Sequence, residues 1–257
     1  MKITLFRLIK VVILLTVLLP MSSESAPQLP LLTVTAGDSQ QDYTVNLQIL
    51  LLLTALSFLP GLLMATTSFT RVLIVLSILR QALGLQQIPP TRVLIAMALI
   101  LTAFIMKPVF TSIWQNAIEP YLEERLSFRD AVEQGSLPLH QFMLRHTRKA
   151  DLEQFMMLAR ESEPAAGNRP TIRPEEAPFT TLIPAFLSSE IKTGLQMGFM
   201  IFLPFLVIDL LVASILMALG MIMLSPLVIS LPFKLLLFTL VDGWGMIMAG
   251  TVRSFSL

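Results

Sequence analysis

The sequence predicts an all-α integral membrane protein, built of apolar helical hairpins with a charged helical insertion. Of its 257 residues, 54% are hydrophobic and only 14% are charged, whereas about 25% of residues are charged in a soluble domain. Apolar stretches recur along the chain, and their lengths are comparable to the roughly 20 residues of a membrane helix. The charges are also concentrated, because 19 of the 35 lie between Trp114 and Thr181.

Residues 1–25 resemble a cleavable signal peptide. A basic start (Lys2, Arg7 and Lys10) precedes an apolar run from Val11 to Leu19, and a short polar stretch ends before Ala26. An uncleaved anchor is the alternative, but this apolar run is shorter than a membrane span. Cleavage would remove three bases and one acid, which changes the net charge from +1 to −1. Residues 26–44 then form an irregular, exported lead-in.

Apolar segments on both sides of the insertion predict four to five spans. We expect a first apolar hairpin region over residues 45–113, with Thr70–Leu85 as an interfacial or re-entrant helix. Arg71, Arg80 and Arg92 place their loop in the cytoplasm by the positive-inside rule, and the 114–181 insertion then faces the periplasm. The apolar segments are Val45–Met64, Val93–Val109, Leu182–Ile208, Leu210–Leu231 and Leu235–Ile247.

The 114–181 insertion carries helical periodicity over Ser127–Gln134 and Leu137–Ala159. Prolines and a glycine over 164–178 predict a linker without regular structure. The aromatic residues Phe142 and Phe155 either pack these helices together or contact a partner.

In the apolar C-terminal region, 182–257, Glu190 and Lys192 lie eight and ten residues into the apolar run that starts at Leu182, and Asp209 separates two strongly apolar stretches. A charge at membrane depth needs a partner or water, so each is a candidate functional residue. They pair with one another or with a neighbouring subunit, or they serve transport. Lys107 and Lys234 are expected to extend toward an interface instead.

The C-terminal region also contains small residues, prolines and methionines in a suggestive arrangement. Gly194 and Gly198 form a small-xxx-small pair, which allows close helix packing. Three prolines are expected to break the apolar run, as in a pore-lining segment: Pro204, Pro226 and Pro232. Met217, Met221 and Met223 either pack in a core or close a pore, because methionine is apolar and flexible.

Several function classes lack their residues in this sequence. The chain has no cysteine, and His140 and His146 are six residues apart, which does not place them on one helical face. We therefore expect no enzymatic activity, no catalytic residues, no cofactor or metal, and no nucleic-acid partner.

Six stretches of the sequence, taken in order, carry a family resemblance: Thr66–Gly84, Phe142–Arg148, Ala150–Leu152, Leu182–Phe186, Ser189–Thr193 and Leu231–Phe238. With these stretches, nearly the whole mature chain resembles the FliP family of flagellar export-gate proteins. The resemblance implies a core subunit of the flagellar type III secretion gate in the bacterial inner membrane, through which unfolded rod, hook and filament proteins pass. It also implies several copies of this chain in a closed helical pore, with FliQ-like and FliR-like subunits and FlhA-like and FlhB-like components as partners.

The resemblance further implies roles for particular residues. The methionine gasket of the family corresponds to Met221, Ile222 and Met223, where this chain departs by having Ile222 in place of a third consecutive methionine. Because isoleucine is branched at its β-carbon and therefore stiffer, the resemblance leaves open whether Ile222 helps to close the pore. Glu190 corresponds to an important family acid, and Phe142 and Phe155 to an aromatic pair in the periplasmic part.

Two alternatives remain at this level. An injectisome gate is similar, but it usually lacks a cleaved signal, so residues 1–25 favour the flagellar system. An ion or small-solute transporter would use Glu190 and Asp209, yet the sequence lacks the inverted repeat common in such folds.

Overall fold

A computed structural model of the chain describes residues 40–85, 88–161, 177–221 and 223–255. The chain divides into two units, Met1–Leu51 and Leu52–Leu257. In the first unit the described residues belong to helix α2 (Gln40–Thr66), which begins inside the predicted irregular lead-in. The predicted signal peptide and most of the 164–178 linker lie outside the described residues.

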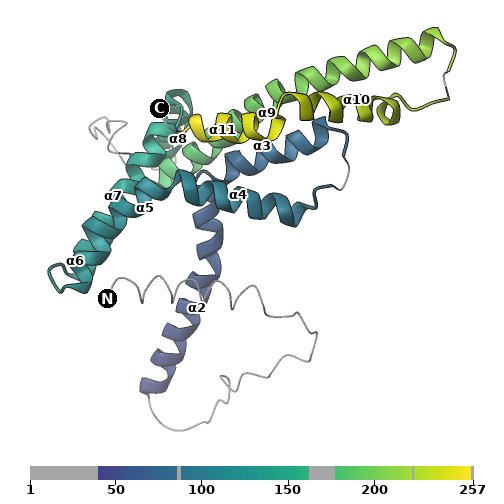
Figure 1. Ribbon diagram of the computed structural model, residues 1–257. Helices are drawn as coiled ribbons and strands as arrows, with labels where there is room; N and C mark the ends of the chain where they lie inside the picture. The colour runs from purple at the N-terminus through teal and green to yellow at the C-terminus, as the bar shows by residue number, and fades with distance from the viewer. Residues whose placement is uncertain (1–39, 86–87, 162–176, 222, 256–257) are drawn as a thin grey trace. The chain divides into compact units, whose positions relative to one another are not determined.

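The second unit contains helices and turns, with no strand among its described residues, which confirms the all-α prediction (Figure 1). The last residues of α2 lead into this series. In chain order the helices that follow are α3 (Phe69–Ala82), α4 (Thr91–Ile105), α5 (Lys107–Ile113), the π-helix η1 (Trp114–Ile118), α6 (Glu119–Leu122), α7 (Phe128–His146), α8 (Lys149–Glu161), α9 (Phe179–Ala218), α10 (Pro226–Leu240) and α11 (Gly243–Arg253).

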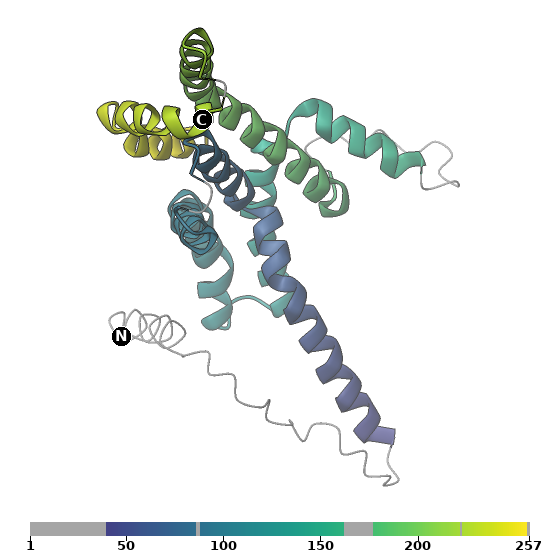
Figure 2. The same ribbon diagram turned by 90° about the vertical axis from the view of Figure 1, so that its right-hand side faces the viewer.

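Helix α9 organises this unit. It contacts α3, α7, α8 and α10, and its distal half runs beside α10 as a long hairpin (Figure 1 and Figure 2). With 40 residues at about 1.5 Å per residue, α9 is roughly 60 Å long, about twice the hydrocarbon thickness of a bilayer. Part of α9 must therefore extend beyond the lipid core if the rest crosses it.

Helix α9 is the single described helix that is long and apolar enough to cross a membrane by itself. Three bent pairs could each add one span, giving at most four: residues 50–82, 91–122 and 226–253. The bends of the second and third pairs are 57° and 64°. The upper count of four spans equals the lower end of the predicted four to five spans.

The small-residue pair on α9 faces α3. A Cβ atom added at Gly194 would lie 3.1 Å from Ile74 Cγ2, and one added at Gly198 would lie 3.0 Å from Ile78 Cβ and 2.2 Å from its Cδ1. The two glycines therefore allow α3 and α9 to approach closely, as the small-xxx-small pattern predicted.

The predicted helix break inside the insertion is wrong. Helix α7 continues from Phe128 to His146 through Gly135 and Pro138, and the break comes at Thr147 instead. A Cβ added at Gly135 would lie 3.3 Å from Ala117 Cβ in η1, so this glycine serves close packing rather than helix termination. The Ser127 side chain caps the first turn by accepting a hydrogen bond from Asp130 N at 3.3 Å.

Two of the three predicted proline breaks are also wrong. Pro204 lies inside α9 and Pro232 lies inside α10, whereas Pro226 stands in the first turn of α10. Proline is tolerated in a first turn, where its missing N–H has no helical partner. The turn between α9 and α10 thus depends on the residues before Pro226.

Candidate functional site

The turn between α9 and α10 presents two methionines at the end of the hairpin. Helix α9 ends in a Schellman motif: Gly220 N donates to Met217 O at 3.1 Å, and Met221 N donates to Leu216 O at 2.9 Å. Gly220 adopts a φ of +70°, which a residue without a Cβ tolerates. Met221 is 45% exposed and Met223 is 99% exposed, while Ile222 lies outside the described residues. The methionine loop, defined here as residues 219–225, thus points its thioethers away from the core.

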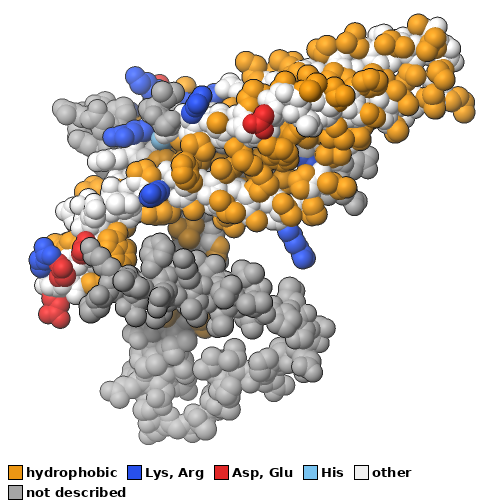
Figure 3. Space-filling model, in the orientation of Figure 1, with side chains coloured by type: hydrophobic (Ala, Val, Ile, Leu, Met, Phe, Trp, Pro, Cys, Tyr) orange, Lys and Arg blue, Asp and Glu red, His pale blue; other side chains and the backbone are white. Residues whose placement is uncertain are grey.

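The hairpin that carries this loop has no charged residue from Leu210 to Phe233. Figure 3 shows hydrophobic side chains covering it on the visible face, whereas Lys, Arg, Asp and Glu gather mainly toward the opposite end of this unit. Many of its large apolar side chains are exposed, including Leu210, Ile215 and Val228. Lipid or other protein chains must cover a surface of this kind.

A buried charge cluster marks the base of the uncharged hairpin. Lys234 Nζ on α10 donates to Asp209 Oδ2 on α9 at 2.6 Å and to the carbonyl oxygen of Ala82, the last residue of α3, at 3.1 Å. Ser230 Oγ donates to Asp209 Oδ1 at 2.5 Å. The Lys234 side chain is only 3% exposed, so the predicted extension toward an interface is wrong. This pair joins α9 and α10 to the end of α3.

A second buried pair joins α9 to α3. Arg71 Nε donates to Glu190 Oε2 at 3.0 Å, and Arg71 Nη2 donates to Glu190 Oε1, so the pair is bidentate. Arg71 Nη1 also donates to Ser254 O at 3.2 Å and Ser254 Oγ at 3.1 Å, and its guanidinium lies 3.8 Å from the centroid of the Phe255 ring. Arg71 therefore lies in the core, and its use as a loop residue in the positive-inside prediction is wrong.

A third pair joins α9 to α8. Lys192 Nζ donates to Asp151 Oδ1, and Ser189 Oγ donates to Asp151 Oδ2 at 2.7 Å. Burial raises the pKa of Asp151. The hydrogen bonds from Lys192 and Ser189 and the positive charges of Lys192 and Arg148 together lower the pKa by more than burial raises it, so the net shift is downward. Asp151 therefore stays ionised at neutral pH.

The three ionisable residues predicted as candidates each have a different partner within this chain, and they do not pair with one another. The residues that sequence reasoning missed are these partners, Arg71, Asp151 and Lys234, which lie 119, 41 and 25 residues from Glu190, Lys192 and Asp209. For Arg71 and Lys234 the available signal was a basic residue in an apolar stretch, whereas Asp151 lies among other charges and carried no such signal. Together the pairs fix α9 to three other helices.

Phe142 and Phe155 belong to the same apolar cluster. The Phe142 ring stacks on Phe255 with centroids 6.2 Å apart and meets Phe186 edge-on at 5.9 Å. Phe142 is only 8% exposed, whereas Phe155 is partly buried at the edge of the cluster. Phe142 thus packs within the chain, and a partner contact by Phe155 stays a prediction.

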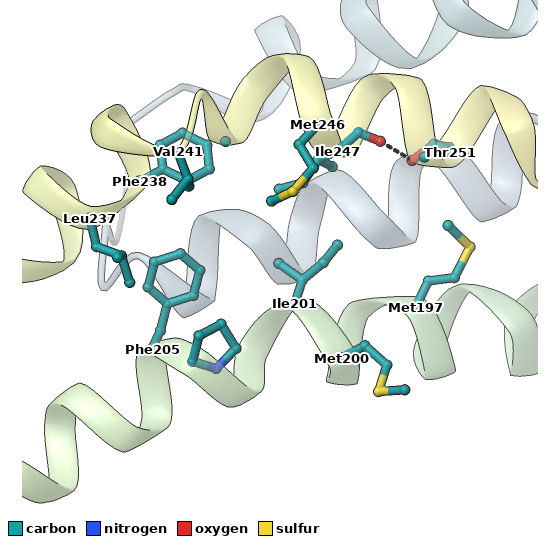
Figure 4. A pocket seen from close by; sticks show the side chains of 13 residues that line it. Met197, Met200, Ile201, Phe205, Leu237, Phe238, Val241, Met246, Ile247 and Thr251 are labelled. Carbon is teal, nitrogen blue, oxygen red and sulfur yellow. Dashed lines mark hydrogen bonds between the residues drawn. The ribbon is translucent and has the colours of Figure 1, made fainter.

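An apolar pocket of about 540 Å³ lies between α9 and the pair α10 and α11, near the hairpin base. Figure 4 shows Ile201, Phe205 and Phe238 directed into it from both sides. Thr251 donates its hydroxyl hydrogen to Ile247 O at 2.8 Å, so this hydroxyl is used within α11. The pocket is suited to covering apolar groups rather than to chemistry. Within the described ranges, no group of three or more His, Asp or Glu side chains could hold a metal ion.

Comparison with known proteins identifies the family. A model of the FliP family matches residues 52–251. The chain belongs to the FliP family. The matched range contains the methionine loop and all three ion pairs, while Ser254 and Phe255, which contact Arg71, follow it directly.

Similar proteins of the FliP family occur in several bacteria, each bearing the name flagellar biosynthetic protein FliP. The protein of Cereibacter sphaeroides is 50% identical over 226 residues, which cover 88% of this chain and 73% of the relative. That of Pectobacterium carotovorum subsp. carotovorum is 47% identical over 89% of this chain and 86% of its own. The Bacillus subtilis protein is 44% identical over 87% of this chain and 98% of its own.

Proposed function

We propose that this chain is the pore-forming subunit of the flagellar type III export gate in the bacterial inner membrane. The observation that carries the proposal is the uncharged α9–α10 hairpin, which ends in exposed methionines and is fixed at its base by the Lys234–Asp209 ion pair. The FliP family match over residues 52–251 supports it, as does the printed name of the relatives, flagellar biosynthetic protein.

In the closed gate, Met221, Ile222 and Met223 from several copies surround the axis. A narrow ring of apolar side chains excludes water, and a dewetted constriction blocks ions. An extended substrate chain then displaces the thioether side chains at low cost, because methionine has three rotatable side-chain bonds. Ile222 moves less readily because it is branched at the β-carbon.

The ion pairs act as structural anchors in this proposal. Asp209 and Glu190 each have a cation within hydrogen-bond distance, at 2.6 Å from Lys234 and 3.0 Å from Arg71. A carboxylate held in this way keeps the hairpin in place and is not free to carry a solute or proton. The proposal therefore assigns the chain a conduit role without an enzymatic step, and it disfavours the small-solute transporter.

The uncharged hairpin surface is covered by other gate chains in this account. We assign the contacts to further copies of this chain and to FliQ-like and FliR-like subunits, with FlhA-like and FlhB-like components nearby. The insertion 114–181 lies on the periplasmic side, where the edge of Phe155 is available to a partner.

Complementation of a strain that lacks this gene tests the proposal. Expression of the wild-type chain restores motility and secretion of hook protein, and a chain that lacks residues 219–225 does not. A matched control that replaces exposed Glu153 by Gln restores both. Secretion of virulence effectors with no restoration of motility would assign the chain to an injectisome instead.

A further inference from the structure

A second cavity lies between α5 and α7, beside Phe255. It has a volume of about 300 Å³. Its apolar walls are formed by side chains that include Ile105, Val109 and Phe142, and its polar groups include Gln141 and Arg145 on α7. A charged and amide-bearing edge beside an apolar wall suits a ligand that has both an anionic and an apolar part.

The charge at this cavity is positive. Its lining contains no acidic residue, and among the described residues Arg145 has no hydrogen-bonded or ion-paired partner. His146 also lines it, with Nδ1 2.8 Å from Phe142 O and Nε2 3.3 Å from Phe255 O. Burial lowers the pKa of His146, and the charges of Arg71 and Arg145 lower it too, although the carbonyl oxygens of Phe142 and Phe255 beside its ring nitrogens oppose them. His146 therefore stays neutral and donates its single N–H to one of the two carbonyls, and Arg145 supplies the charge.

The position of the cavity along the chain is that of a membrane boundary. On one side, α4 and α5 expose the apolar side chains of Ile100, Phe104 and Phe110. On the other side, Trp114 and Tyr121 are partly exposed, and the charged residues of α6 and α7 follow. Tryptophan and tyrosine are enriched where hydrocarbon meets water, and an arginine binds a phosphate group by charge-assisted hydrogen bonds.

We propose that this cavity binds the headgroup phosphate of an anionic phospholipid, with Arg145 as the cation. The Gln141 amide donates to the phosphate, and an acyl chain lies along Ile105 and Val109. The lipid fills the space between α5 and α7 beside Phe255. This inference rests on the proposed membrane location of the chain.

Retention of lipid by the purified protein tests the site. The full chain, extracted in mild detergent with the subunits that accompany it, is exposed to phosphatidylglycerol or phosphatidylcholine and examined by native mass spectrometry. We expect phosphatidylglycerol to be retained selectively and Arg145→Gln to weaken its binding about tenfold, the size of one lost charge-assisted hydrogen bond. Arg129→Gln, an exposed change on the same helix, should retain lipid as the wild type does.

A second variant distinguishes loss of lipid binding from a folding defect of Arg145→Gln. Val109→Trp fills the cavity and keeps Arg145, so we expect it also to lose phosphatidylglycerol. Equal retention by Arg145→Gln and Arg129→Gln would overturn the proposal, as would equal retention of phosphatidylcholine. Displacement of the lipid by inorganic phosphate alone would assign the site to free phosphate. Lost gate assembly with lipid retained in Arg145→Gln would assign it to a protein partner. Failure of the lipid site leaves motility and secretion, which test the export function, unaffected.

Discussion

Replacing Glu190 by Ala should destabilise the protein strongly. The Glu190 side chain is 0% exposed and the Arg71 side chain 4%, and the substitution removes both carboxylate oxygens that accept from the guanidinium. Arg71 keeps only its contacts with Ser254 and Phe255, which carry no negative charge. Leaving one member of a buried pair without its partner costs about 3–5 kcal/mol. For a chain of this size, that cost lowers the melting temperature by roughly 6–20 °C.

Thermal unfolding of the purified protein in mild detergent measures this effect. Glu153→Ala is the matched control, because Glu153 lies on the surface of α8, and its cost should stay within about 0.5 kcal/mol. Replacing Arg71 and Glu190 together by Met should recover most of the loss, since no charge then remains buried. A Glu190→Ala protein with the same melting temperature as Glu153→Ala would refute the structural role of the Arg71–Glu190 pair.

Three further predictions concern the helix contacts and pairs of α9. Gly198→Ala should prevent the close approach of α3 and cost about 1–3 kcal/mol, whereas Gly250→Ala, with nothing within 4 Å of the added Cβ, should be neutral or stabilising in the same melting assay. Because the pKa of Asp151 is lowered from 3.8, ionised Asp151 stabilises the folded protein above pH 3.8, and this stabilisation is lost as the pH falls below that value. Below pH 3.8 the melting temperature of the wild type should therefore fall more steeply than that of Asp151→Asn. Asp209→Ala should abolish motility, because it leaves the Lys234 charge buried at a cost of about 3–5 kcal/mol. Restored gate assembly in the double variant Asp209→Ala with Lys234→Met would separate this cause from a direct role of the carboxylate. Normal motility of Asp209→Ala would contradict the prediction.

The sequence predicted the helical class because this class depends on local patterns. Apolar length indicates membrane helices, and a glycine before the loop permits the left-handed turn that ends α9. The helix ends were less predictable. The predicted periodicity was interrupted between Gln134 and Leu137, and Pro204 was interpreted as a break, while α7 and α9 continue through these positions. Tertiary context overrides propensity at such positions.

The partners of the ionisable residues could not be predicted from spacing. Glu190 meets Arg71 across 119 residues, and this contact depends on the packing of α3 against α9. The same packing requires Gly194 and Gly198, which the sequence pattern did indicate. The resemblance to the FliP family added the role of the loop, which composition alone leaves open between core packing and a pore.

Ion conductance of the reconstituted gate tests the central claim most directly. Gates that carry Met221→Ala and Met223→Ala together should conduct ions in the absence of substrate, because smaller side chains leave a wider, wetted constriction. Met157→Ala, which changes another exposed methionine, on α8, should leave the gate as tight as the wild type. Intact gates with the doubly substituted loop that conduct no more than wild type would contradict the account.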